Sequence, residues 1–116
     1  MGQRRRRPRE NPSEAAERQS LFREVNERIQ QLGESFDLAE EPFHIVCECG
    51  NDGCHEMIEL SESEYEQVRQ NPERFAVLPG HEIPEVERIV GANDGFLIVE
   101  KVGEGGRIAA ARDPRR

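Results

Sequence analysis

Three cysteines within eight residues constrain this chain more than any other feature of its sequence. Cys47, Cys49 and Cys54 follow the pattern C-x-C-x4-C, and the chain contains no other cysteine. If residues 43–49 form a strand, the side chains of Cys47 and Cys49 point to the same face. Residues 50–53, Gly-Asn-Asp-Gly, are typical of a turn that returns Cys54 towards them. The sequence therefore predicts a β-hairpin, with residues 57–60 as the second strand, that carries three thiols.

Convergent thiols of this kind favour a metal site. Thiolate ligands select zinc, copper(I) or iron-sulfur chemistry, and zinc is the commonest ion in a cysteine-rich tetrahedral site. A disulfide is the first alternative, but the odd number of cysteines and a reducing compartment argue against it. A second alternative is three buried thiols, because cysteine also behaves as a small hydrophobic residue. We expect a metal site with zinc as its cofactor.

A closed structural zinc site needs a fourth ligand. The sequence Pro-Gly-His-Glu at residues 79–82 predicts a rigid turn that presents the imidazole of His81 to the hairpin. His55 follows Cys54 directly, so in an extended segment its side chain points away from the metal. We favour His81. The alternatives that stay open are a water molecule, His55, His44, which lies off the Cys47 face, and the weaker oxygen donors Glu48 and Glu56.

A long amphipathic helix is predicted for residues 13–38. Ser13 is a good N-cap, and acidic residues follow in the first turn. Apolar residues recur at spacings of three and four, as in a coiled-coil seam; they are Phe22, Val25, Ile29, Leu32 and Phe36. We expect this stripe to pack on the protein's own sheet. The alternative is that it binds another protein chain or a second copy of this one.

The rest of the chain predicts one small α+β domain over residues 39–102, with the metal as a staple for a thin core. Ser61 and Glu64 form the capping box of a second helix. Residues 75–78 are expected to form a short strand, and residues 86–91 to pair with residues 96–102 in a second hairpin. Residues 1–12 are expected to be a disordered basic tail, and residues 103–116 a flexible tail.

The charge distribution limits the possible partners. Residues 10–111 hold 23 acidic and 8 basic residues, which disfavours nucleic-acid binding except through the arginine-rich ends. No apolar run is long enough to cross a bilayer, and no apolar stretch follows the N-terminal arginines as it would in a secretory signal. We therefore expect a cytoplasmic location and a protein partner.

Several segments taken together resemble a known family. They are F-R-E-V-N-E-R-I from residue 22, F-H-I-V-C-E-C-G-N-D-G-C from residue 43, L-S-E-S-E-Y-E-Q-V-R from residue 60 and F-A-V-L-P-G-H-E from residue 75. This combination is similar to a family of short, uncharacterised actinobacterial proteins, over roughly residues 20–102. The resemblance implies no activity. It does imply that the cysteine motif and P-G-H-E belong to one module, which supports His81 as the partner of the three cysteines.

These observations favour a structural metal site in an interaction or regulatory module. Two alternatives use the same cysteines: a thiol-based redox or metal sensor, and a zinc-dependent hydrolase-like enzyme with Glu56 or Glu82 as its base. The motif H-E-x-x-H is absent from the sequence, and thiolate-rich zinc sites are usually structural. We therefore do not expect an enzyme.

Overall fold

The computed structural model describes residues 12–35, 42–51 and 53–115, and over these residues the chain has the predicted α+β class. The helices are α1 (Pro12–Ser35), α2 (Glu62–Arg69) and α3 (Gly103–Ala111). The strands are β1 (Phe43–Val46), β2 (Met57–Leu60), β3 (Arg74–Val77), β4 (Glu87–Asn93) and β5 (Phe96–Lys101). The predicted tail before Pro12, and the stripe residue Phe36, lie outside the described residues.

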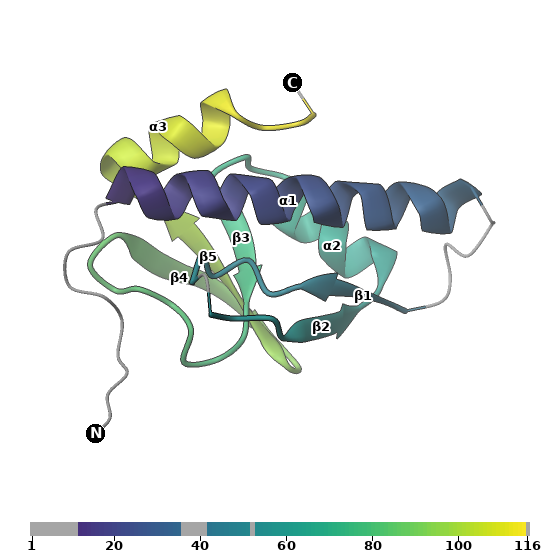
Figure 1. Ribbon diagram of the computed structural model, residues 1–116. Helices are drawn as coiled ribbons and strands as arrows, with labels where there is room; N and C mark the ends of the chain where they lie inside the picture. Colours follow the sequence, from purple (N-terminus) through teal and green to yellow (C-terminus); the bar gives the residue numbers. More distant parts are fainter. Residues whose placement is uncertain (1–11, 36–41, 52, 116) are drawn as a thin grey trace.

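Two small antiparallel sheets form the centre of the fold. β1 pairs with β2, whereas β3, β5 and β4 form a three-stranded sheet in that order. Both predicted hairpins are confirmed, although β1 ends at Val46, three residues earlier than expected. The pairing continues for one more residue, because the backbone N–H of Cys47 donates to the carbonyl of Glu56 over 2.9 Å. Figure 1 shows α1 lying across these strands, with α3 against its N-terminal half.

The second helix begins as its sequence predicts. The hydroxyl of Ser61 accepts from the backbone N–H of Glu64 over 3.1 Å, and the Glu64 carboxylate accepts from the backbone N–H of Ser61 over 2.8 Å. This capping box satisfies two backbone donors that the first turn would otherwise leave unpaired. The helix buries Tyr65 and Val68 against the core, which also contains Phe75 of β3 and Phe96 of β5.

The first helix is oriented opposite to our expectation. Val25 is 47% exposed and Leu32 is 59% exposed, so the prediction that the apolar stripe packs on the sheet is wrong for these residues. Phe22 and Ile29, at the edge of the stripe, are half-buried. The face turned inward is polar and repeats at helical spacing: Ala16, Gln19, Ser20, Arg23, Asn26, Glu27 and Gln30. Hydrogen bonds to other elements, described below, replace the apolar packing that the sequence pattern indicated.

This orientation predicts a sharp contrast between two leucines. Leu32→Ala on the outer face of α1 should change the free energy of unfolding by less than about 0.5 kcal/mol, since it removes little buried surface. The same substitution at Leu60, which is 2% exposed on β2, should cost about 2–5 kcal/mol. Urea denaturation of both variants measures the difference. Equal losses would mean that the stripe faces the core.

The C-terminal segment also differs from our expectation. Residues 103–116 were expected to form a flexible tail, but Gly103–Ala111 form α3, which packs on α1. Glycines normally weaken a helix, which is why the sequence indicated a loop. Here they permit close approach: a Cβ atom on Gly106 would lie 3.1 Å from the carbonyl oxygen of Lys101. A Cβ atom on Gly105 would lie 3.0 Å from Cε of the same lysine, so both glycines serve the packing of α3.

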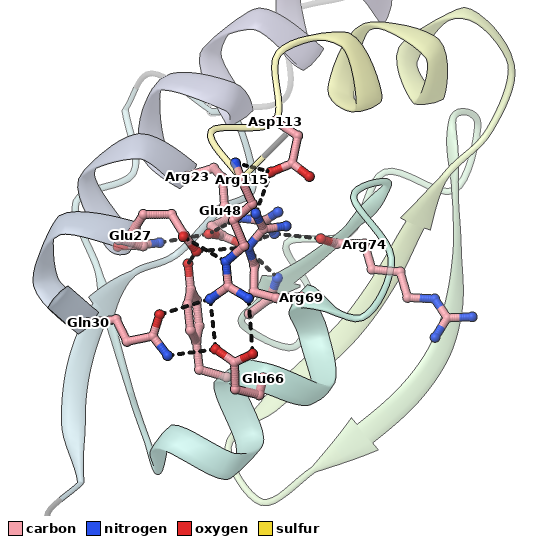
Figure 2. Close-up of polar contacts among 12 residues, drawn as sticks. Arg23, Glu27, Gln30, Glu48, Glu66, Arg69, Arg74, Asp113 and Arg115 are labelled. Atoms are coloured by element: carbon pink, nitrogen blue, oxygen red, sulfur yellow. Dashed lines mark hydrogen bonds and ion pairs between the residues drawn. The ribbon is translucent and has the colours of Figure 1, made fainter. Parts of the chain in front are cut away.

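Beyond α3 the chain is held by ion pairs that it makes with both α1 and α2. Figure 2 shows Arg115 bridging Glu27 of α1 and Glu66 of α2. Arg115 donates to both carboxylate oxygens of Glu66, over 3.0 and 2.7 Å, and to Glu27 over 2.8 Å. Arg69 donates to Glu27 over 2.8 Å and also pairs with Asp113. The end of the chain therefore ties two helices together.

The contact with Arg115 predicts a pH effect at Glu66. Hydrogen bonds from Arg115 lower the pKa of Glu66 from 4.5 to about 2. A carboxylate with a lowered pKa stabilises the folded state above its unfolded pKa, and that contribution is lost as the pH falls towards about 2. Arg115→Ala should return the pKa of Glu66 towards its ordinary value and remove this part of the acid dependence. NMR titration of the Glu66 carboxyl carbon measures it, and Arg88→Ala, on the exposed side of β4, should leave it unchanged.

Candidate metal centre

Four side chains from two separate parts of the chain meet at one point. Cys47 and Cys49 follow β1, Cys54 lies just before β2, and His81 follows β3. Their ligand atoms all lie within 4.8 Å of one another. The grouping predicted from the sequence, with His81 as the fourth member, is therefore present in the fold. These residues are able to hold a metal ion.

The distances fit a tetrahedral ion of the size of zinc. Nδ1 of His81 lies 3.7 Å from Sγ of Cys47 and 3.7 Å from Sγ of Cys54. With Zn–S bonds of about 2.3 Å and a Zn–N bond of about 2.0 Å at tetrahedral angles, sulfur and nitrogen ligands lie about 3.5 Å apart. These two separations need to shrink by only about 0.2 Å to match such an ion.

Backbone geometry explains how His81 reaches the cysteines. The backbone N–H of His81 donates to the carbonyl of Leu78 over 2.9 Å, which closes a four-residue turn. Pro79 and Gly80 are the second and third residues of this turn. Gly80 has a φ of +90°, which a type II turn requires at its third position and which glycine adopts without strain. The backbone N–H of Leu78 also donates to Sγ of Cys47 over 3.3 Å. The same turn thus supplies one ligand and supports another.

The second loop of the site is equally well defined. The backbone N–H of Cys54 donates to the carbonyl of Asn51 over 3.0 Å, and the side chain of Asn51 accepts from the N–H of Gly53 over 2.9 Å. An asparagine that bonds its own backbone two residues on stabilises a tight turn. This turn places Cys54 beside the pair formed by Cys47 and Cys49.

Burial and mutual contacts perturb the three thiols. Cys47 is 0%, Cys49 1% and Cys54 8% exposed. A hydrogen bond from Cys47 lowers the pKa of Cys49 to about 5, and the same bond raises the pKa of the donor Cys47. Burial raises the pKa of Cys54. The cluster therefore favours one thiolate, at Cys49, beside two protonated thiols. A cation at its centre would displace the protons of those two thiols.

The other proposed ligands lie elsewhere. His55 is exposed, and His44 is exposed on β1 opposite Glu59. Neither belongs to the ligand cluster, nor does Glu56. Glu82, proposed as a base, accepts a hydrogen bond from the backbone N–H of Gly80 over 2.9 Å. Of the alternatives weighed from the sequence, the geometry therefore favours His81.

Glu48 lies in a different environment from the one expected from the sequence. It was considered a weak metal ligand, but its carboxylate is fully buried on the side away from the cysteines. There it accepts two hydrogen bonds from Arg23 of α1, each 2.9 Å long. Side chains alternate along an extended segment, so the sequence did indicate that Glu48 points away from the sulfurs of Cys47 and Cys49. The neighbouring sequence did not indicate that Arg23 would be its partner.

Comparison of the chain with protein families, with curated proteins and with solved structures finds no match to any of them. Within the part of the chain that the structure describes, none of the helices combines the length and the apolar character needed to traverse a lipid bilayer.

Proposed function

We propose that the protein binds zinc through Cys47, Cys49, Cys54 and His81, and that the metal is structural. The observation that carries this proposal is the meeting of four donor atoms within 4.8 Å, with Nδ1 of His81 lying 3.7 Å from Sγ of Cys47 and of Cys54, close to the separation in a tetrahedral zinc site. Zinc suits a set of three thiolates and one imidazole, and it has no redox chemistry of its own. The proposal assumes a reducing compartment, in which the thiols stay available.

The donor set supports a structural rather than a catalytic ion. Catalytic zinc keeps a position open for water, whereas structural zinc is surrounded by four protein ligands. Here four protein donors are available, and the three thiols are buried. Burial also argues against a redox sensor, since sensor cysteines are accessible thiolates. The donor set therefore disfavours a catalytic ion, and the burial of the thiols disfavours a redox sensor.

Metal content measured on two histidine variants tests this assignment. We expect one zinc ion per wild-type chain. His81→Ala should lower zinc affinity by at least about 100-fold, because loss of a ligand should cost no less than loss of a residue that orients one. His55→Ala is the matched control, because His55 is exposed and outside the cluster, and it should bind like wild type. Equal affinity for zinc in the wild type and His81→Ala would refute the proposed ligand set.

We further propose that the zinc-stabilised domain acts by binding another protein through the outer face of α1. This face presents Leu21, Val25 and Leu32 to solvent, with Phe22 and Ile29 beside them. Apolar residues at spacings of three and four on an exposed helix fit the groove or seam of a partner helix. The strongly acidic composition of residues 10–111 disfavours nucleic acid as the ligand.

A paired substitution tests the interaction. Val25→Glu with Leu32→Glu should abolish recovery of a specific partner by the tagged protein from its own cells, and should leave zinc content unchanged. Arg88→Glu with Ile89→Glu, on the exposed edge of β4, is the control. A partner retained by the α1 variant and lost with the β4 variant would place the interface on the sheet. Sedimentation of the purified wild-type protein would reveal whether the partner is a second copy.

A further inference from the structure

The inner face of α1 binds the short segment that carries two of the four candidate ligands. Four side chains of the helix donate to residues 46–50, which we call the ligand segment. Arg18 donates to the carbonyl of Gly50 over 2.7 Å, and Gln19 to the carbonyl of Glu48 over 2.9 Å. Asn26 both donates to the carbonyl of Val46 and accepts from its N–H, over 2.9 and 2.8 Å. The remaining contacts, from Arg23 and Asn26, are to the Glu48 side chain.

Glu48 is the centre of these contacts. Its carboxylate accepts two bonds from Arg23, one from Asn26 over 2.8 Å and one from the backbone N–H of Ala76 over 2.9 Å. Its own N–H donates to the carbonyl of Ala76 over 2.9 Å. The ligand segment is thus held between α1 on one side and β3 on the other. The turn that carries His81 follows directly from β3.

The negative charge of Glu48 is paired with the positive charge of Arg23. Glu48 and Arg23 are 0% and 2% exposed at their side chains, and the guanidinium also stacks on the ring of Phe75, 4.3 Å from its centre. A buried carboxylate that loses such a partner is costly, so the segment strongly favours the arrangement that keeps Arg23 in place. That arrangement also orients the backbone between Cys47 and Cys49.

We infer that Glu48 positions the Cys47–Cys49 pair for metal binding, and that metal occupancy is thereby linked to the docking of α1. This inference rests on the proposed metal site. Arg18, Gln19, Arg23 and Asn26 are buried or half-buried polar side chains on the inner face of α1, and these hydrogen bonds to the ligand segment are lost unless residues 46–50 hold this conformation, so its loss weakens docking of the helix. A metal ion fixes that conformation through Cys47 and Cys49. By thermodynamic reciprocity, docking of α1 must strengthen metal binding to the same extent.

The linkage has a consequence for the outer face of α1. Leu21, Val25 and Leu32 are exposed on a helix whose opposite face is held in part by the ligand segment. Loss of metal would loosen the helix, and with it the surface that we propose binds a partner. Metal occupancy would therefore favour the interaction, and partner binding would strengthen metal binding to the same extent.

Zinc affinity of two glutamate variants, measured by competition with a chromophoric chelator, tests the inference. Glu48→Gln keeps the size of the side chain but removes the charge that pairs with Arg23. It should weaken zinc binding about 10- to 100-fold, as substitution of residues that orient metal ligands commonly does. Glu27→Gln is the comparison variant: Glu27 is also buried on α1 and bonds Tyr65 and Arg69, but none of its hydrogen bonds reaches residues 46–50. It should lower stability and weaken zinc binding clearly less than Glu48→Gln, because it acts on the metal only through the stability of the fold.

Equal losses of zinc affinity in the two variants, or none in Glu48→Gln, would overturn the inference while leaving the metal site intact. If Glu48→Gln does not fold, Asn26→Ala replaces it, since Asn26 contacts both Val46 and Glu48 and is expected to show the same loss. Hydrogen exchange of the wild-type chain gives a second readout. When zinc is removed, amides of α1 should lose protection at least as early as those of β3 and β5, which open in the unfolding that we expect without metal. Retained protection in α1 would contradict the linkage. A wild-type chain that binds no zinc would instead refute the proposed function itself.

Discussion

Removal of the metal is expected to unfold the domain. Cys49→Ser replaces a buried thiol that we assign as a ligand, and it should abolish the cooperative thermal transition measured by circular dichroism. Structural zinc contributes an apparent binding free energy of about 10–16 kcal/mol in small zinc domains. This binding free energy is as large as the whole net stability of a typical domain, about 5–15 kcal/mol. The thin core of this chain leaves little to compensate for the loss.

The chelated wild-type protein provides the control for this substitution. Excess chelator should produce the same loss of the thermal transition, and added zinc should restore it, whereas zinc should not rescue Cys49→Ser. A chain that keeps its melting temperature after complete removal of metal would contradict a structural role. In that event the three thiols would be ordinary core residues.

Breaking the buried ion pair should have the second largest effect. Arg23→Met leaves the Glu48 carboxylate buried without the guanidinium that bonds it twice. Loss of one partner from a buried pair typically costs about 3–5 kcal/mol, because the remaining charge is uncompensated. Burial alone would lower the pKa of Arg23, but the charge and hydrogen bonds of Glu48 raise it, so the guanidinium stays charged in this contact.

Urea denaturation of the single and double variants measures this cost. Glu48→Gln added to Arg23→Met should recover part of the lost stability, since a neutral amide is cheaper to bury than a carboxylate. Leu32→Ala on the outer face of the same helix controls for effects of altering α1. Additive losses from the two substitutions at positions 23 and 48 would show that the pair contributes no coupling.

The metal cluster and the hairpins could be predicted because their signals are local. Cys47, Cys49 and Cys54 lie within eight residues, and the turn between them is defined by its own asparagine. His81 needed a tertiary contact, but a type II turn follows from Pro79 and Gly80 at fixed positions. Short-range patterns of this kind largely determine backbone direction.

The orientation of α1 could not be predicted in the same way. Periodicity identified the helix correctly but assigned the wrong face to the core, because apolar residues are normally the buried ones. The partners of the polar face are distant in sequence: Gln19 bonds Glu87, which lies 68 positions away, and Asn26 bonds Val46. A single sequence contains no signal for such pairs. The same holds for α3, whose glycines are explained by the close approach of Lys101 and, at Gly106, of Glu73.

The most direct test of the metal centre is the X-ray absorption spectrum of the purified protein at the zinc edge. We predict stoichiometric zinc with a first shell of three sulfur ligands, at about 2.3 Å, and one nitrogen ligand, at about 2.0 Å. His81→Ala should replace the nitrogen of imidazole by an oxygen from water or lose the metal. A purified wild-type protein without stoichiometric zinc, or one whose zinc is bound by oxygen and nitrogen without the three sulfurs, would contradict the assignment of Cys47, Cys49, Cys54 and His81.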